Sequence, residues 1–279
     1  MTIPAPALSD IKLIVSDLDG TLLKGWSPDI SERAFPLIEA LTDRGIPFFA
    51  ASGRQYTSLR RLFGSLADRI GYVCENGALV IYRDEVLLKR FFPRERAIAI
   101  FNAIAAHPDC EVFASGERTC YYLEGHDDFR DHLVNITKCD VTPIAGLEDI
   151  EEPIIKVALK VPEEKNAQIR AEFDGAFGAG YRVVTSGTAW IDVVQVGVDK
   201  GVALTELGER LGIDLADMLA FGDELNDREM LDVVGHPCLM ETGNHELRSL
   251  NDRIRLCSSV EDELERLLGT ASAAGAPAE

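Results

Sequence analysis

Two acidic residues, Asp17 and Asp19, directly follow an apolar run over 11–16 and precede Gly20 and Thr21. Carboxylates at the edge of a hydrophobic core need a cation, and a hard cation such as Mg²⁺ prefers oxygen ligands. Aspartate and glycine are also common turn-forming residues, so this segment taken alone fits an ordinary acidic turn equally well. The rest of the chain has to decide between the two interpretations.

Two further segments place polar residues where an apolar run meets a helical pattern. In "FAASGR", Ser52 and Gly53 open a helical segment and offer a hydroxyl and backbone N–H groups to an anion. The alternative is that Ser52 only caps the helix. In "GVDKGVAL", Lys200 stands at a predicted helix start, where its charge opposes the helix dipole. A phosphate-binding role explains that placement, and a solvated lysine is the alternative.

A fourth segment, "GDELND", supplies two more carboxylates and an amide. Asp223 follows another apolar run, and Asn226 and Asp227 come about one helical turn later. Helix capping would explain Asp223 or Asn226 individually. The four segments together describe a site for a metal ion and a phosphate group, which independent caps would rarely reproduce.

The predicted elements bring these segments to one place. Strands alternate with helices at both ends of the chain, which predicts an α/β fold with a doubly wound, parallel, Rossmann-like sheet. Ligands bind at the carboxyl ends of the strands in such sheets. The predicted strands are 11–16, 46–52, 189–197, 217–222 and a last one at "IRLCSS", and the predicted helices are 31–44, 54–67, 201–211, 226–234 and 260–268.

The middle of the chain has a different pattern. Asn76 and Gly77 lie between two apolar runs, which predicts a β-hairpin. Beyond it, helical patterns at 94–106 and 163–177 are separated by alternating runs typical of a sheet with one covered face. We therefore predict a core formed by 1–83 and 188–279, with an inserted α+β cap over 84–187.

Composition narrows the class of partner. The formal net charge of −19 and the lack of a long basic run argue against nucleic-acid and anionic-membrane partners. The six cysteines show no C-x-x-C pair, so we expect buried thiols in a reducing compartment. The sequence shows no secretory signal or long apolar span, which predicts a cytoplasmic protein. The tail 270–279 lacks apolar spacing, and we expect it not to pack.

The four segments resemble the haloacid-dehalogenase-like (HAD) superfamily, in particular its Cof-type, subfamily IIB, C2-capped phosphatases. "DLDGTLL", "SGR", "VDKGVAL" and "GDELND" are similar to its four motifs, and "ENGA" is common in this branch. The family usually has a segment close to "GVAMGNA" after the fourth motif. Here the corresponding segment is "HPCLMETGNHEL", so we expect the loop within 237–247 to differ.

The resemblance implies a Mg²⁺-dependent phosphomonoesterase with an aspartyl-phosphate intermediate. Asp17 is then the nucleophile and Asp19 the general acid and base. The metal is held by Asp17, the Asp19 backbone carbonyl and Asp223, with Asp227 a ligand through water or a partner of Lys200. The implied phosphate-binding residues are Leu18, Ser52, Gly53, Lys200 and Asn226, and the candidate substrate contacts are Arg54 and Asn76.

The expected substrate is a small phosphorylated metabolite, such as a sugar phosphate or a phosphorylated cofactor, because the cap is predicted to close over it. A phosphosugar mutase or specialised sugar-phosphate phosphatase on the same core is the alternative, and a phospho-accepting signalling module is a third interpretation. Asp19 argues against the last, because a general acid and base makes a phosphoenzyme transient. We expect a monomer or a homodimer.

Overall fold

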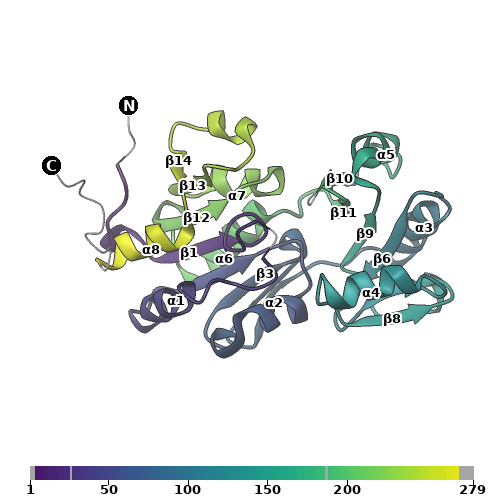
Figure 1. Ribbon diagram of the computed structural model, residues 1–279, viewed down its shortest axis with the longest axis horizontal. Helices are drawn as coiled ribbons and strands as arrows, with labels where there is room; N and C mark the ends of the chain where they lie inside the picture. The colour runs from purple at the N-terminus through teal and green to yellow at the C-terminus, as the bar shows by residue number, and fades with distance from the viewer. Residues whose placement is uncertain (1–3, 26, 186–187, 270–279) are drawn as a thin grey trace.

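The computed structural model describes residues 4–25, 27–185 and 188–269, which form two β-sheets lying side by side (Figure 1). In the larger, eight-stranded sheet, the strands from β14 to β3 are parallel, and β4 and β5 complete one edge as antiparallel strands. In spatial order its strands are β14 (Arg255–Cys257), β13 (His236–Met240), β12 (Met218–Gly222), β1 (Leu13–Asp17), β2 (Phe48–Ala51), β3 (Gly71–Cys74), β4 (Leu79–Tyr82) and β5 (Glu85–Lys89).

Helices cover both faces of the eight-stranded sheet because its central strands are apolar on both sides. Successive side chains of a strand point to opposite faces. Ile14 of β1 packs in the cluster with α1, α2 and α8, whereas Leu13 and Val15 pack in the cluster with α6 and α7. These helices are α1 (Ala34–Asp43), α2 (Tyr56–Phe63), α6 (Lys200–Leu211), α7 (Arg228–Val233) and α8 (Val260–Leu268).

The six-stranded sheet is antiparallel apart from the β7–β8 pair. Its strands, in spatial order, are β10 (Tyr181–Thr185), β11 (Trp190–Gln195), β9 (Lys156–Lys160), β6 (Glu111–Ser115), β7 (Cys120–Leu123) and β8 (Val141–Ile144). One face packs on α3 (Arg94–Ala105) and α5 (Asn166–Phe173). The other face meets α4 (Asp127–Asn135) and, nearer β9 and β11, the loops of the larger sheet.

The predicted fold class is confirmed, with a mostly parallel core sheet and a separate α+β part. The Asn76–Gly77 segment connects the antiparallel strands β3 and β4, as the hairpin pattern predicted. All six cysteines are free and buried, as expected. The tail 270–279 lies outside the described residues.

The sheet membership of two strands was predicted wrongly. The segment 189–197 was assigned to the core, but β11 pairs antiparallel with β9 and β10 in the six-stranded sheet. Conversely, β5 begins inside the predicted insert and pairs with β4. A continuous apolar run does not reveal which sheet it joins. The exact division into core and cap stays a prediction.

Several elements had no sequence prediction, among them one helix and one strand of the larger sheet. Helix α4 was missed, and the segment "HPCLM" is strand β13, parallel to β12 and β14. The loop that follows β13, which we expect to differ from the family's usual segment, contacts the candidate site. In this loop, the backbone N–H of Asn244 donates to the backbone carbonyl of Asp223 at 2.7 Å.

Candidate active site

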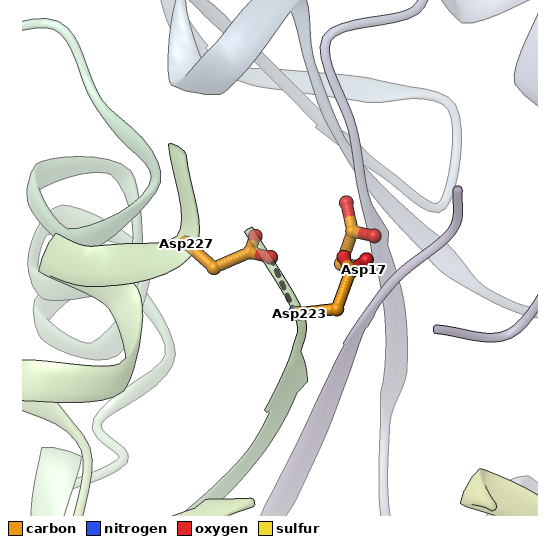
Figure 2. Close-up of side chains that lie close together, drawn as sticks. All are labelled: Asp17, Asp223 and Asp227. Carbon is orange, nitrogen blue, oxygen red and sulfur yellow. Dashed lines mark hydrogen bonds between the residues drawn. The ribbon is translucent and has the colours of Figure 1, made fainter. Parts of the chain in front are cut away.

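Three aspartates converge at the carboxyl ends of two neighbouring parallel strands. Asp17 is the last residue of β1, Asp223 follows the adjacent strand β12, and Asp227 lies one turn later, just before α7 (Figure 2). One carboxylate oxygen from each lies within 4.8 Å of the others. Parallel pairing of β1 and β12 therefore brings together residues more than 200 positions apart in the sequence.

Lys200 joins two of these carboxylates. Its Nζ atom lies 2.6 Å from Oδ1 of Asp17 and 2.6 Å from Oδ1 of Asp227, and its side chain is fully buried. Lys200 is the first residue of α6, where the dipole disfavours a cation. Asp199, the N-cap residue of α6, offsets this cost, because its carboxylate accepts a hydrogen bond from the backbone N–H of Val202 at 2.8 Å.

The acidic cluster carries more negative charge than Lys200 neutralises. Three carboxylates and one ammonium group leave a net charge of −2 when all are ionised. Burial raises the pKa of Asp17 well above its usual range, Asp227 raises it further, and Lys200 lowers it. Burial and the charge of Asp227 likewise raise the pKa of Asp223 to about 7. The cluster therefore favours the uptake of protons or of a cation.

The cluster also has an unpaired carboxylate oxygen. Oδ2 of Asp17 is buried and has no hydrogen-bond partner among the described residues. Leaving a buried carboxylate oxygen unpaired is costly, so the position favours a ligand that the protein alone does not supply. The second oxygen of Asp227, in contrast, accepts the backbone N–H groups of Asp223 and Glu224 at 2.9 and 3.2 Å. An oxygen-only donor set of this kind fits Mg²⁺.

Asp19 lies apart from the three clustered aspartates. Its side chain is 57% exposed, and both carboxylate oxygens accept from the guanidinium of Arg54, at 2.9 Å from Nε and 2.5 Å from Nη2. The structure thus places Arg54 on Asp19. Leu18, between the two motif aspartates, is fully buried, and its carbonyl accepts the N–H groups of Thr21 and Leu23.

Ser52 and Gly53 lie beside the aspartates because Asp17 and Ala51 are paired in the register of β1 and β2. Ser52 and Gly53, the two residues that follow β2, therefore leave the sheet next to the end of β1. Ser52 is 2% exposed, and its hydroxyl oxygen accepts the backbone N–H of Arg54 at 3.2 Å. This hydroxyl retains its hydrogen for another acceptor.

Asn76 and Asn226 form a bridge between the hairpin and the fourth motif. Nδ2 of Asn226 donates to Oδ1 of Asn76 at 3.3 Å, and Nδ2 of Asn76 donates to Oδ2 of Asp192 at 2.7 Å. The hairpin turn is held against the second motif by the bond from the N–H of Asn76 to the carbonyl of Ser52. Ten of the eleven sequence-predicted site residues therefore lie at the carboxyl ends of β12, β1, β2 and β3 or in the segments that follow them, and the eleventh, Lys200, reaches the aspartates from the start of α6.

Sequence reasoning missed four polar residues at these loops. Thr21 donates its hydroxyl to Oδ1 of Asp223 at 3.2 Å. Glu75, Lys156 and Asp192 form a buried charged group beside Gly53. The signal for Lys156 and Asp192 was weak: each is a charged residue in an otherwise apolar run, "IIKVAL" and "WIDVVQ", which an exposed position on a strand would also explain.

Comparison with known proteins places these features in a family context. A model of haloacid dehalogenase-like hydrolases matches residues 14–261. The 5-amino-6-(5-phospho-D-ribitylamino)uracil phosphatase of Escherichia coli K12 is 29% identical over 231 residues, covering 83% of this chain and 85% of that protein. The HMP-PP phosphatase of E. coli O8 is 27% identical over 254 residues, covering 85% and 87%.

The fold has close counterparts among solved structures. A protein from Streptococcus mutans UA159 superposes with a TM-score of 0.82 at 27% identity, covering 93% of this chain and 99% of that chain. Among the described residues, no helix combines the length and apolar character needed to cross a bilayer.

Proposed function

We propose that this chain hydrolyses small phosphomonoesters through an aspartyl-phosphate intermediate, with Mg²⁺ as cofactor. The chain belongs to the haloacid dehalogenase-like hydrolase family and is a phosphatase of its Cof-type branch. The observation that carries the proposal is the buried, unpartnered Oδ2 of Asp17 at the centre of the acidic cluster. A buried carboxylate with a purely structural role would normally have both oxygens hydrogen-bonded. A nucleophile needs one oxygen free and the other fixed.

The proposed Mg²⁺ ligands are Asp17, the backbone carbonyl of Asp19 and Asp223. Asp227 would contribute through water, although its direct contacts with Lys200 and with two backbone N–H groups favour a role in orienting Lys200. When bound, the ion would supply positive charge that offsets the repulsion between the nucleophile and an anionic phosphate group.

The chain's own residues would carry the bond changes. Oδ2 of Asp17 attacks phosphorus while the bond to the ester oxygen breaks, and Asp19 gives its proton to the departing alkoxide. Asp19 then takes a proton from water, which attacks the aspartyl-phosphate, releases inorganic phosphate and restores the Asp17 carboxylate. Lys200 holds Oδ1 of Asp17 so that Oδ2 faces the substrate. Proton transfer of this kind contributes roughly 10²–10⁴-fold.

The phosphoryl oxygens would be bound by groups that surround Asp17. These are the Leu18 backbone N–H, the Ser52 hydroxyl, the Gly53 backbone N–H, Lys200 and the Asn226 amide. The burial of Ser52 and Lys200 supports this assignment, because buried donors interact more strongly with a charged group than exposed ones do. Arg54 and Asn76 stay candidate substrate contacts, with Arg54 released from Asp19 on binding.

The six-stranded sheet with its helices α3, α4 and α5, here called the six-stranded part, would act as a lid over the substrate and exclude bulk water. Lys156 of β9 donates to the carbonyl of Gly53 in the phosphate-binding loop (52–54), and Asp192 of β11 accepts from Asn76 of the neighbouring hairpin turn, which supports this placement. The names of the two relatives indicate that they act on small phosphorylated compounds. We therefore propose a small phosphorylated metabolite as the substrate class of this chain. A monomer or homodimer in the cytoplasm stays the expectation.

A phosphate-release screen over a panel of sugar phosphates, nucleotides and phosphorylated cofactors tests the proposal. Release should require Mg²⁺, stop with chelator, and be lost in Asp17→Asn. Asp217→Asn serves as the matched control, because Asp217 pairs with Lys12 on the surface. Mass spectrometry of enzyme quenched during turnover should detect a phosphate group on Asp17, whereas a phosphate that stays on Asp17 in the isolated protein would favour the signalling module. Isomerised sugar phosphate without free phosphate would favour the mutase, and release that persists in Asp17→Asn would refute the mechanism.

A further inference from the structure

A second buried group of charges connects the six-stranded part to the phosphate-binding loop. Lys156, the first residue of β9, is 5% exposed, and its Nζ lies 2.8 Å from Oε2 of Glu75 and 3.4 Å from Oδ1 of Asp192. Glu75 and Asp192 are 1% and 2% exposed. Lys156 also donates to the backbone carbonyl of Gly53. The mechanism proposed above uses none of these three side chains.

Strand alternation explains why Lys156 and Asp192 point to the core. Val157 and Leu159 of β9 pack in the cluster with α3 and α5, and so do Ile191 and Val193 of β11. Lys156, which precedes Val157, and Asp192, which lies between Ile191 and Val193, therefore face the opposite side of the sheet. Because β9 and β11 are neighbours, Lys156 and Asp192 lie on one surface, directed at the loops of the larger sheet.

Gly53 lies close against this surface. A Cβ atom at position 53 would stand 3.1 Å from Oδ1 of Asn76 and 3.3 Å from Oδ2 of Asp192. At those distances the neighbouring side chains would have to shift by a few tenths of an ångström. The absence of a side chain at position 53 thus allows the phosphate-binding loop to approach Asp192 of the other sheet.

The Gly53–Arg54 peptide is held at both of its polar atoms. Its carbonyl oxygen accepts from the ammonium of Lys156, and its N–H donates to the hydroxyl oxygen of Ser52 at 3.2 Å. In a trans peptide the C=O and N–H groups point in opposite directions, so fixing the one aims the other. A cation at the carbonyl also polarises the peptide and strengthens the N–H as a donor.

The Ser52 hydroxyl is oriented by this peptide. A hydroxyl has one hydrogen and two lone pairs. Because the N–H of Arg54 occupies a lone pair, the hydroxyl hydrogen is directed elsewhere and can be donated. The contacts thus form a continuous chain from a residue of the six-stranded sheet to a hydroxyl next to Asp17.

We propose that Lys156 is a positioning residue for phosphate binding: through the Gly53–Arg54 peptide, it fixes the Ser52 hydroxyl as a hydrogen-bond donor to the phosphoryl group. The inference rests on the phosphate-binding role proposed above for Ser52. It gives the six-stranded part a contribution to phosphate affinity that does not require any contact between Lys156 and the substrate.

The test compares Lys156→Met, Ser52→Ala and the double variant. Binding of inorganic phosphate is measured by calorimetry in saturating Mg²⁺, and KM and kcat are measured with p-nitrophenyl phosphate. Each single variant should bind phosphate about three- to tenfold more weakly, the range expected for one hydrogen bond, with KM rising more than kcat falls. The double variant should bind no more weakly than Ser52→Ala, because both changes remove the same donor.

A conservative variant and a surface control separate this role from a structural one. Lys156→Arg keeps the positive charge and should recover part of the phosphate affinity. Lys165→Met is the control, since Lys165 pairs with Asp109 on the exposed side of the six-stranded part. This variant should match the wild type in every measurement.

Three outcomes would overturn the inference: unchanged phosphate binding in Lys156→Met, multiplicative losses in the double variant, or a fall in kcat with no change in KM. If Lys156→Met does not fold, Glu75→Gln/Lys156→Met replaces it, with Glu75→Gln as reference. That pair of changes keeps the net charge of the group at −1, as two carboxylates and one ammonium give in the wild type. A wild type that does not bind phosphate would refute the proposed function instead.

Discussion

The ammonium of Lys200 lies 2.6 Å from Oδ1 of Asp17, and both side chains are buried at the end of β1. This contact leaves only one oxygen of Asp17 free for chemistry. It also makes Lys200 the counter-ion of a cluster that would otherwise hold three uncompensated carboxylates. Burial lowers the pKa of Lys200, but Asp17 and Asp227 outweigh burial and raise it above its usual value. The lysine therefore stays charged throughout the physiological range.

Replacing Lys200 with Met should reduce kcat roughly 10²–10³-fold, the effect of removing one electrostatic stabiliser from an active site. It should also lower the free energy of unfolding by about 3–5 kcal/mol at pH 8, because buried carboxylates lose their partner. Urea unfolding measures the second effect. The loss should be smaller at pH 6, where the carboxyls take up protons, and Lys165→Met should show neither change. Equal stability of Lys200→Met and wild type at pH 8 would contradict the assignment.

The pKa of Asp223 predicts a pH dependence for the metal-free protein. The native carboxyl has a pKa of about 7, whereas an unfolded chain has one near 3.9. Between these values the folded protein holds a proton that the unfolded chain has released, so stability falls as pH rises through this window. In EDTA, the melting temperature should be higher at pH 5.5 than at pH 8.

Magnesium and Asp223→Asn should both reduce that difference. Metal binding requires the carboxylate form, so saturating Mg²⁺ should stabilise the protein more at pH 8 than at pH 5.5. In Asp223→Asn the titrating group is absent, and the melting temperature should change less between the two values. A wild type that melts at a higher temperature at pH 8 in EDTA would show that the sign is wrong.

Arg54→Gln should lower kcat/KM about tenfold or more. The Asp19 side chain is 57% exposed, and Arg54 is the residue that fixes both of its oxygens. Because Arg54 is proposed to move from Asp19 to the substrate on binding, the variant loses both the contact that places Asp19 in the free enzyme and a charged contact to the substrate, and a misplaced Asp19 reduces the rate. Arg69→Gln is a suitable comparison, because Arg69 pairs with Glu39 and Asp43 at the surface. Steady-state kinetics with both variants would expose a general surface-charge effect as equal losses.

Gly77→Ala should disturb the site through the backbone. Gly77 has φ of +100°, and a Cβ there would stand 2.3 Å from the carbonyl oxygen of Asp199, the residue before Lys200. Gly125 has φ of +86° but open space around it, so Gly125→Ala reports the φ strain alone, about 1–2 kcal/mol. Gly77→Ala should lose more stability than Gly125→Ala and should also lose activity. Equal melting temperatures of the two variants would show that the backbone at Asp199 moves away from the added Cβ without further loss of stability.

Local sequence patterns predicted the parts of the site that lie at strand ends. Each of Asp17, Ser52 and Asp223 follows an apolar run, and parallel strands bring such positions to one edge whatever their separation in sequence. The position of Lys200 at a helix start also carried a signal, because a cation there is unfavourable without a partner. For these residues the chain order of elements was sufficient.

The contacts between the two sheets could not be predicted in this way. A lysine in an apolar strand pattern indicates an exposed position on an alternating strand, and no sequence pattern near Lys156 indicates that Glu75 is its partner. Strand β11 was misplaced for the same reason, since its apolar run suits either sheet. Such contacts depend on how two separately formed layers meet, and that is a property of the whole molecule.

The chain leaves the larger sheet beside the helix at which it returns. It leaves after β5, where Arg90 pairs with Glu206 of α6, and it returns at the start of that same helix. The intervening segment can therefore lengthen, shorten or be exchanged without breaking a ladder of the parallel strands. Under the proposed roles of the two parts, such an arrangement would separate inheritance of the reaction from inheritance of the substrate: one gene segment could be replaced while the residues at the ends of β1 and β12 remain in register.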